Sequence, residues 1–196
     1  DRNGLGRNNL LYISLILSHL SARNAGGDNT FFRLIAIEEP EAHLHPHLQD
    51  HLAKNIESIQ KGGGKAMQLL LTTHSTHIAA KMSLKNSVIL FNNNDSRPAS
   101  HYILSGVDES AEKNTVHYLS KYIDATKSRM FFARKIILVE GIAEQLLIPL
   151  FFRKNSDKTL EKVGCNIINV NGVAFSHFLK IIRSGFFIKG LVLTDS

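Results

Sequence analysis

The stretch Leu34-Ile35-Ala36-Ile37-Glu38-Glu39-Pro40-Glu41 is the most informative part of this 196-residue sequence. Four apolar residues, two of them β-branched, run directly into two adjacent carboxylates and a proline. Such an apolar run is typical of a buried parallel strand, and open α/β sheets bind ligands at the carboxyl ends of their strands. Adjacent carboxylates repel each other, so their presence here needs an explanation. A Mg²⁺ site supplies one, in which one carboxylate holds the metal shell and the other orients or deprotonates the attacking water.

A histidine follows the next expected strand. Residues 70–75 read Leu-Leu-Thr-Thr-His-Ser, so His74 stands at a strand end, and one helix separates this strand from the first. Both strand ends then fall on one edge of the sheet, where His74 could reach a γ-phosphate or its attacking water. Alone, a histidine at a strand end is more often structural and a pair of glutamates is more often a solvated turn. In this order and spacing, they favour a nucleotide-hydrolysis site.

The sequence contains no phosphate-binding loop of the pattern Gly-x-x-x-x-Gly-Lys-Ser/Thr, whose backbone N–H groups cradle phosphates. Residues 62–66 read Gly-Gly-Gly-Lys-Ala, without the first glycine at the right spacing and without the final hydroxyl. We expect this stretch to end a helix. We also expect the true loop upstream of Asp1, so that residues 1–196 alone bind ATP poorly.

A second set of carboxylates lies in the last third of the chain. Glu140 follows the apolar run 135–139, Glu144 lies one turn into the next expected helix, and Asp195 follows the run 191–193. Three carboxylates at the strand ends of one parallel sheet fit a Mg²⁺ or Mn²⁺ site. The alternative is that Glu140 and Glu144 are turn and cap residues, which the helix dipole favours.

These motifs carry two resemblances. Residues 34–46 followed by 72–75 resemble the Walker B, D-loop and switch-histidine segments of ABC-type ATPases, and residues 3–9 lie where that branch carries its signature motif. Residues 139–144, 170–172 and 193–196 resemble the motifs of a Toprim domain. The last Toprim motif reads Asp-x-Asp, and its second aspartate would be residue 197. We therefore expect a fragment of a longer protein, incomplete for both activities.

The order of the two halves resembles the OLD (overcoming lysogenization defect) family of nucleases, which includes Gabija-type anti-phage subunits. The resemblance implies a metal-dependent DNA endonuclease regulated by ATP. It also implies a homodimer or larger homo-oligomer, and it is compatible with a helicase-like partner protein. It also implies a role for each matching residue. Glu38 would support Mg²⁺, Glu39 would be the catalytic base and His74 the switch histidine, Gly4 and Gly6 would contact nucleotide, Glu140 would be catalytic, and Glu140, Glu144 and Asp195 would hold the metal.

Two other interpretations stay open. The first is an ATPase that senses or remodels DNA, with a Toprim-like half that serves only as a scaffold. The second, from a class without enzymatic activity, is a dimerisation and nucleic-acid-docking module. A short glycine loop such as that of Gly4 and Gly6 is also as often merely a turn.

The composition limits the class of protein. A hydrophobic content of 43% is enough for a packed core. The single cysteine, Cys165, excludes an internal disulfide and favours a reducing, cytoplasmic compartment. No run reaches the roughly 18 apolar residues of a membrane span, so we expect no membrane partner. The net charge of +6 suits a polyanion such as DNA, or merely a solvated face. The densest basic group is Lys121, Lys127, Arg129, Arg134 and Lys135.

We expect an α/β protein that joins the C-terminal part of an ABC-type ATPase sheet to the start of a Toprim sheet. The expected domains are the ATPase part over residues 1–109, a helical connector over 110–133 and the Toprim part over 134–196. The apolar periodicity predicts strands over 33–37, 68–72, 88–91, 102–104, 135–139, 166–170 and 191–193. It predicts helices over 10–20, 46–60, 78–82, 142–152 and 175–182, with polar loops over 1–9 and 21–30.

Overall fold

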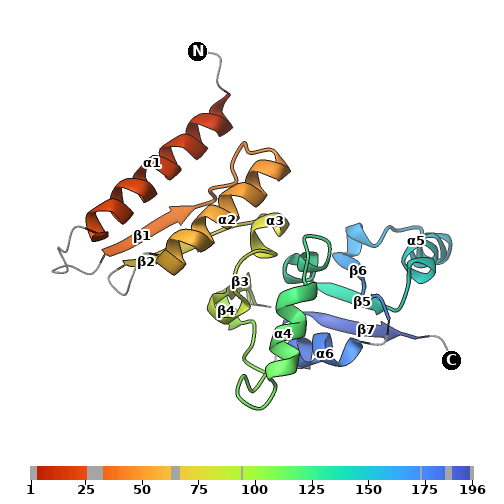
Figure 1. The fold of residues 1–196 in the computed structure, drawn as a ribbon. Helices are drawn as coiled ribbons and strands as arrows, with labels where there is room; N and C mark the ends of the chain where they lie inside the picture. The colour runs from red at the N-terminus through yellow and green to blue at the C-terminus, as the bar shows by residue number, and fades with distance from the viewer. Residues whose placement is uncertain are drawn as a thin grey trace. The chain divides into compact units, whose positions relative to one another are not determined.

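A computed structural model describes residues 4–25, 33–62, 67–93, 95–172, 174–183 and 187–194 (Figure 1). The chain divides into two compact units, Asp1–Met82 and Ser83–Ser196. Both units contain parallel strands with helical crossovers, which confirms the expected α/β class. Among the helices of the described ranges, none is long and apolar enough to cross a membrane.

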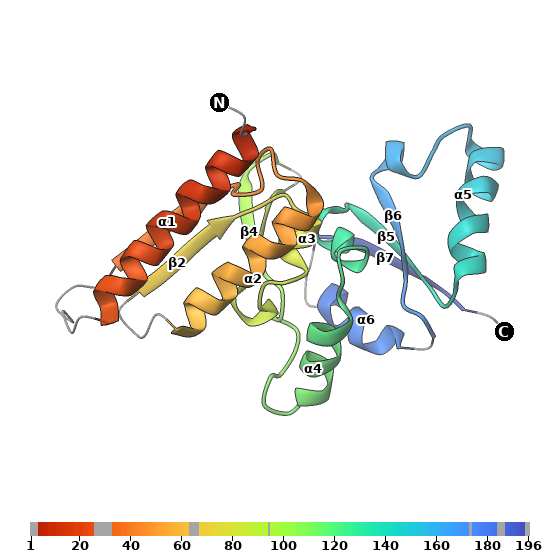
Figure 2. The same cartoon turned by 45° about the horizontal axis from the view of Figure 1, so that its top comes forward.

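The first unit is built on two parallel strands, β1 (Arg33–Glu38) and β2 (Met67–Thr72), joined by helix α2 (Pro46–Gly62). Their register pairs Glu38 with Thr72, so both strands end at one edge. Helix α1 (Leu5–Ala25) runs beside this pair together with α2 (Figure 2). The core between helices and strands contains Leu17, Leu52, Ile56 and Ile78, packed against Ile35, Ile37, Leu69 and Leu71.

Two predictions for α1 were wrong. The helix begins at Leu5, within the expected polar loop over 1–9, and continues to Ala25, past the expected end at residue 20. The polar residues of its first turns are tolerated because Arg7 and Asn8 face solvent. Gly6, in the same turn, is buried. Residues 1–3 and 26–32 lie outside the described ranges.

The short helix α3 (Thr76–Ala79) begins two residues before the expected range of 78–82. Ser75 caps it as predicted, because its hydroxyl oxygen accepts hydrogen bonds from the N–H groups of His77 and Ile78. A serine at this position satisfies donors that the first helical turn leaves free. The cap therefore fixes where the helix starts.

The described residues of the second unit form two separate sheets. One is an antiparallel pair, β3 (Val88–Asn92) with β4 (Pro98–Tyr102), preceded by the short 3₁₀ helix η1 (Leu84–Asn86). The other has strand order β6-β5-β7, all parallel. Its strands are β5 (Lys135–Val139), β6 (Cys165–Asn169) and β7 (Lys189–Leu193), joined through α5 (Ile142–Ser156), η3 (Glu161–Val163) and α6 (Phe175–Arg183).

The strand expected over 102–104 was misplaced. β4 ends at Tyr102, and Ile103 and Leu104 lie in a turn where they are 3% and 1% exposed. Their apolar side chains are explained by this burial in the core and not by strand pairing. The strand instead begins at Pro98, a position that an edge strand tolerates.

The expected connector over 110–133 consists of α4 (Lys113–Tyr122) and the 3₁₀ helix η2 (Lys127–Phe132), separated by a turn at Asp124. Both helices contribute to the core of the second unit, which includes Leu119 and Met130 together with Leu138, Ile168 and Phe178. The three-part division at residues 109 and 133 stays a prediction, and the connector lies inside the second compact unit.

Candidate functional site

The first candidate site lies where β1 and β2 end. Glu39 follows β1 directly, with a positive φ of 43°, and its N–H donates to the carbonyl of Thr72 at 3.0 Å. This bond ties the residue after β1 to the last residue of β2. The structure thereby brings Glu39 and His74 together, with 3.0 Å between Glu39 Oε1 and His74 Nε2.

Both side chains of this pair are accessible. The His74 side chain is 81% exposed and the Glu39 side chain 49%. Glu38, the last residue of β1, is also exposed. An accessible carboxylate in contact with an imidazole is able to hold, orient or deprotonate a water molecule. Catalytic roles for Glu38, Glu39 and His74 stay predictions.

Glu41 is a residue of this site to which the sequence analysis assigned no role. Its Oε1 accepts hydrogen bonds from Thr73 Oγ1 at 2.7 Å, from the His74 N–H at 2.7 Å and from the Ser75 N–H at 3.0 Å. Glu41 Oε2 is buried without a hydrogen-bond partner among the described residues. The available signal was the Thr-Thr-His-Ser run, which offers hydroxyl and backbone donors after a strand that pairs with the strand before Glu41.

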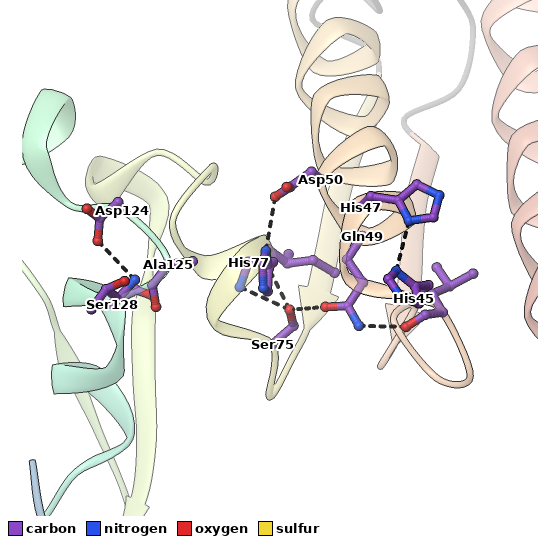
Figure 3. Close-up of polar contacts among 12 residues, drawn as sticks. His45, His47, Gln49, Asp50, Ser75, His77, Asp124, Ala125 and Ser128 are labelled. Atoms are coloured by element: carbon purple, nitrogen blue, oxygen red, sulfur yellow. Dashed lines mark hydrogen bonds and ion pairs between the residues drawn. The ribbon is translucent and has the colours of Figure 1, made fainter.

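A second polar chain runs from the same loop to α2. Ser75 Oγ donates to Gln49 Oε1 at 2.5 Å, and Gln49 Nε2 donates to the Leu44 carbonyl at 2.9 Å. Figure 3 shows Gln49 between Ser75 and the start of α2, with His77 Nδ1 directed at Asp50 Oδ1, 3.3 Å away. The loop after β1 and the loop after β2 are therefore joined both directly and through α2.

The two glycines assigned to nucleotide contact differ in their surroundings. A Cβ on Gly6 would lie 2.2 Å from the His43 carbonyl oxygen, so Gly6 packs against the loop after β1 in its own chain. Gly4 is exposed, and a Cβ there would have no heavy atom within 4 Å. Gly6 thus has a packing role in this unit, and nucleotide contact by either glycine stays a prediction.

The second candidate site lies at the carboxyl end of β5. Glu140 is partly buried, and its carbonyl accepts the Gly172 N–H at 2.9 Å. Glu144 Oε2 accepts the N–H of Gly141 at 3.0 Å, which places this carboxylate at the first turn of α5. One oxygen of Glu144 therefore acts as the helix cap that the sequence offered as the alternative to metal binding. The same carboxylate has a second oxygen for another partner.

Asp195, the third expected metal ligand, lies outside the described ranges. The register pairs Val139 with Leu193, so β5 and β7 end at the same edge. Within the part of the chain that the structure describes, no group of three or more His, Cys, Asp or Glu residues is placed to hold a metal ion. The three-carboxylate site accordingly stays a prediction that includes Asp195.

One member of the expected basic group is buried. Lys127 is 7% exposed, and its ammonium lies 3.2 Å from Asp124 Oδ2. Partial burial alone would raise the pKa of Asp124, but hydrogen bonds from the Lys127 N–H and ammonium and from the Thr126 N–H lower it below its ordinary value. Figure 3 shows the turn at Asp124, whose carbonyl accepts the Ser128 N–H at 2.8 Å. Lys121, Arg129, Arg134 and Lys135 remain exposed.

Comparison with known proteins finds a match to a family model in each of two segments of the chain. Residues 1–79 match the AAA ATPase domain, and residues 131–196 match the TOPRIM domain of proteins like the overcoming lysogenization defect protein. Endonuclease GajA of Bacillus cereus (strain HuB5-5) is 29% identical over 216 aligned positions, which cover 98% of this chain and 30% of the relative. The Old nuclease of Escherichia phage P2 is 23% identical over 162 positions, covering 83% of this chain and 27% of the relative. The chain therefore spans less than a third of the length of either relative.

Proposed function

We propose that this chain, in which an AAA ATPase domain precedes the TOPRIM domain of the overcoming lysogenization defect family, forms part of an ATP-regulated, divalent-metal-dependent DNA endonuclease. One observation carries the proposal. Each half of the chain places a carboxylate at the carboxyl end of a parallel strand. Glu38 ends β1 and Glu39 follows it, and Glu140 follows β5. This is the edge at which open α/β sheets bind their ligands.

In the ATPase half, we assign Glu39 the role of general base for the water that attacks the γ-phosphate. His74, in contact with Glu39, would orient that water or sense the phosphate. Glu38 would hold Mg²⁺ through its exposed carboxylate. Gly4 and Gly6 would face a nucleotide bound by another copy in a homodimer or larger homo-oligomer.

In the TOPRIM half, the donor set is chemically suited to Mg²⁺ or Mn²⁺, since both ions prefer carboxylate oxygens. Glu140 is only partly buried, and Glu144 has one oxygen beyond the one that caps α5. Glu140 and Glu144 would hold the metal together with Asp195. When bound, such a metal activates water and stabilises charge on the scissile phosphate.

We also propose partners and a location. The exposed basic residues Lys121, Arg129, Arg134 and Lys135 would contact the DNA backbone without reading its sequence. A helicase-like partner protein and a role in anti-phage defence are proposals that rest on the family. A cytoplasmic location agrees with the single, buried cysteine, Cys165.

The test is a supercoiled-plasmid nicking assay with the full-length protein in Mg²⁺ or Mn²⁺, run in parallel with ATP turnover. Glu140→Ala should abolish nicking and leave ATP turnover in place, because it removes a metal ligand of the TOPRIM half alone. Glu39→Gln should lower ATP turnover by about 10²- to 10⁴-fold, the usual contribution of a general base. Equal nicking by wild type and Glu140→Ala would refute the nuclease assignment.

A second function has one observation in its favour. One carboxylate oxygen of Glu144 accepts the Gly141 N–H. This helix-capping contact is expected if Glu144 has a structural role and binds no metal. In that case the protein is a DNA-sensing or remodelling ATPase with a non-catalytic TOPRIM-like half. ATP turnover that depends on Glu39, with no nicking by the wild type in either metal, would favour this second function.

A further inference from the structure

Glu41 connects the two loops that form the first candidate site. Three donors converge on Glu41 Oε1, and all belong to the loop after β2, namely the Thr73 hydroxyl, the His74 N–H and the Ser75 N–H. A carboxylate that accepts several N–H and O–H groups makes stronger hydrogen bonds than a neutral oxygen does. The loop that carries His74 is therefore held to the loop that carries Glu39 by a charge-assisted contact.

The geometry at His74 explains why that contact matters. The ring of His74 is 81% exposed, so surrounding side chains do little to restrict it. The backbone N–H of His74 donates to Glu41, and its ring Nε2 contacts Glu39. Glu39 and Glu41 lie two residues apart in the loop after β1. An exposed side chain keeps much of its rotamer freedom, so the position of its backbone decides whether its ring is within reach of a partner.

The other oxygen of Glu41 indicates that stability alone does not account for this residue. Glu41 Oε2 is buried without a hydrogen-bond partner in the described part of the chain, and a buried polar atom left unpaired destabilises the folded state. A residue chosen for packing would avoid this unpaired oxygen. Unpaired buried groups are rare in folded proteins and each calls for an explanation, and a functional constraint on the geometry of Glu41 would supply one.

We propose that Glu41 is a positioning residue, which holds the His74 backbone so that the His74 ring meets Glu39. The proposal rests on the proposed function for the ATPase half and adds a residue to it. Glu41 itself touches no reacting atom. Ser75 supports the same loop through Gln49 and Leu44, so the removal of Glu41 loosens the loop without releasing the second connection.

The test uses two measurements on the full-length protein. Hydrogen-exchange mass spectrometry of a peptide spanning residues 71–79 reports the His74 and Ser75 amides, and steady-state kinetics separates kcat from KM for ATP. Glu41→Ala should speed exchange in this peptide and lower kcat on the order of 10- to 100-fold, with KM within about twofold, because misplacement affects the chemical step. Glu41→Gln should recover part of kcat, since its amide oxygen still accepts the His74 N–H.

Asp50→Asn is the matched control. It removes one charge beside His77 on the same unit, and it leaves the loop of residues 73–75 untouched. It should leave both readouts at wild-type values. If Glu41→Ala loses protection throughout α2 as well, Thr73→Val decides the question, because it deletes a single donor to Glu41 and should shift both readouts in the same direction by less.

The outcomes separate the two proposals. Unchanged exchange in Glu41→Ala, or faster exchange with unchanged kcat, overturns the positioning role and leaves the proposed function in place. A KM that rises while kcat stays constant also overturns it, because Glu41 would then act in binding. A wild-type protein that turns over no ATP overturns the ATPase part of the proposed function, and with it any positioning role for Glu41.

Discussion

Lys127 is a charged residue that is buried, although lysines are usually exposed. The sequence places Lys127 in the densest basic group, yet its side chain is buried and pairs with Asp124. Burial of an ammonium is tolerated only with a partner, because an unpaired buried charge destabilises the fold. The Asp124 side chain is 59% exposed, so solvent screening limits what the pair contributes.

The pH dependence of stability follows from Asp124. Its pKa is lowered in the folded state, so its stabilising contribution is complete above the ordinary value of 3.8 and is lost as the pH falls through the lowered value. Asp124→Asn should lower the free energy of unfolding of the second unit at pH 7 by about 1–2 kcal/mol, because Lys127 loses its countercharge. Urea unfolding at pH 7 and at pH 3 should show this difference shrinking with acidification.

The control for this prediction is Asp95→Asn. Asp95 lies on the exposed turn between β3 and β4, so its substitution removes the same charge from a solvated position. The control should match the wild type at both pH values. A difference between Asp124→Asn and wild type that is equal at pH 7 and pH 3 would contradict the charge-based explanation.

Helix α1 shows how a contact made elsewhere decides where an element begins. Glycine and asparagine near the N-terminus predicted a polar loop, since both residues have low helix propensity. In the structure the first turn of α1 instead brings Gly6 against the His43 carbonyl, where no larger residue fits. Tertiary packing routinely overrides propensity in this way, because the packed face supplies most of the stability of a helix.

Gly6 and Gly4 provide a matched pair at the scale of this element. Gly6→Ala should destabilise the first unit by about 1–3 kcal/mol, because the new Cβ overlaps the His43 carbonyl and the backbone must shift. Gly4→Ala should change stability by no more than about 0.5 kcal/mol, since its surroundings are open. Amide exchange of α2 in the full-length protein measures both effects. Equal effects of the two substitutions would contradict the packing role.

At the scale of the whole molecule, the two units have separate cores. The core of the first unit includes Ile56, and that of the second includes Leu138, both 0% exposed. Every residue of either cluster belongs to its own unit. A cavity introduced into one of these clusters therefore removes packing contacts within that unit.

Ile56→Ala and Leu138→Ala test this separation. Each should destabilise its own unit by about 2–5 kcal/mol, the range for buried aliphatic residues truncated to alanine. Hydrogen exchange should accelerate in α2 and β2 for Ile56→Ala and in β5 and β6 for Leu138→Ala, so that each variant serves as the other's control. Faster exchange of both units in either variant would show that the units unfold together.

Much of the fold could be predicted from the sequence because local periodicity specifies local structure. Apolar runs placed β1, β2, β5, β6 and β7 within two residues of their observed bounds. The same runs predicted that Glu39 and His74 follow adjacent strands, since the side-chain pattern of a parallel strand is continuous and strand ends meet at one edge. Strand β4 was misplaced because its residues are mostly small or polar, whereas the apolar residues that suggested a strand, Ile103 and Leu104, are buried in a turn.

The sequence by itself thus determined the α/β class, the order of the two halves and the residues that stand at the strand ends. Only the tertiary structure decided the contacts between distant residues. The hydrogen bond from the His74 N–H to Glu41 spans 33 positions, and neither residue indicates it locally. The burial of Lys127 and the packing of Gly6 on His43 are likewise features that the tertiary structure decides. Their physical reason is shared, because hydrogen bonding, desolvation and close packing depend on which atoms meet in space, and a linear pattern specifies only which residues are neighbours in the chain.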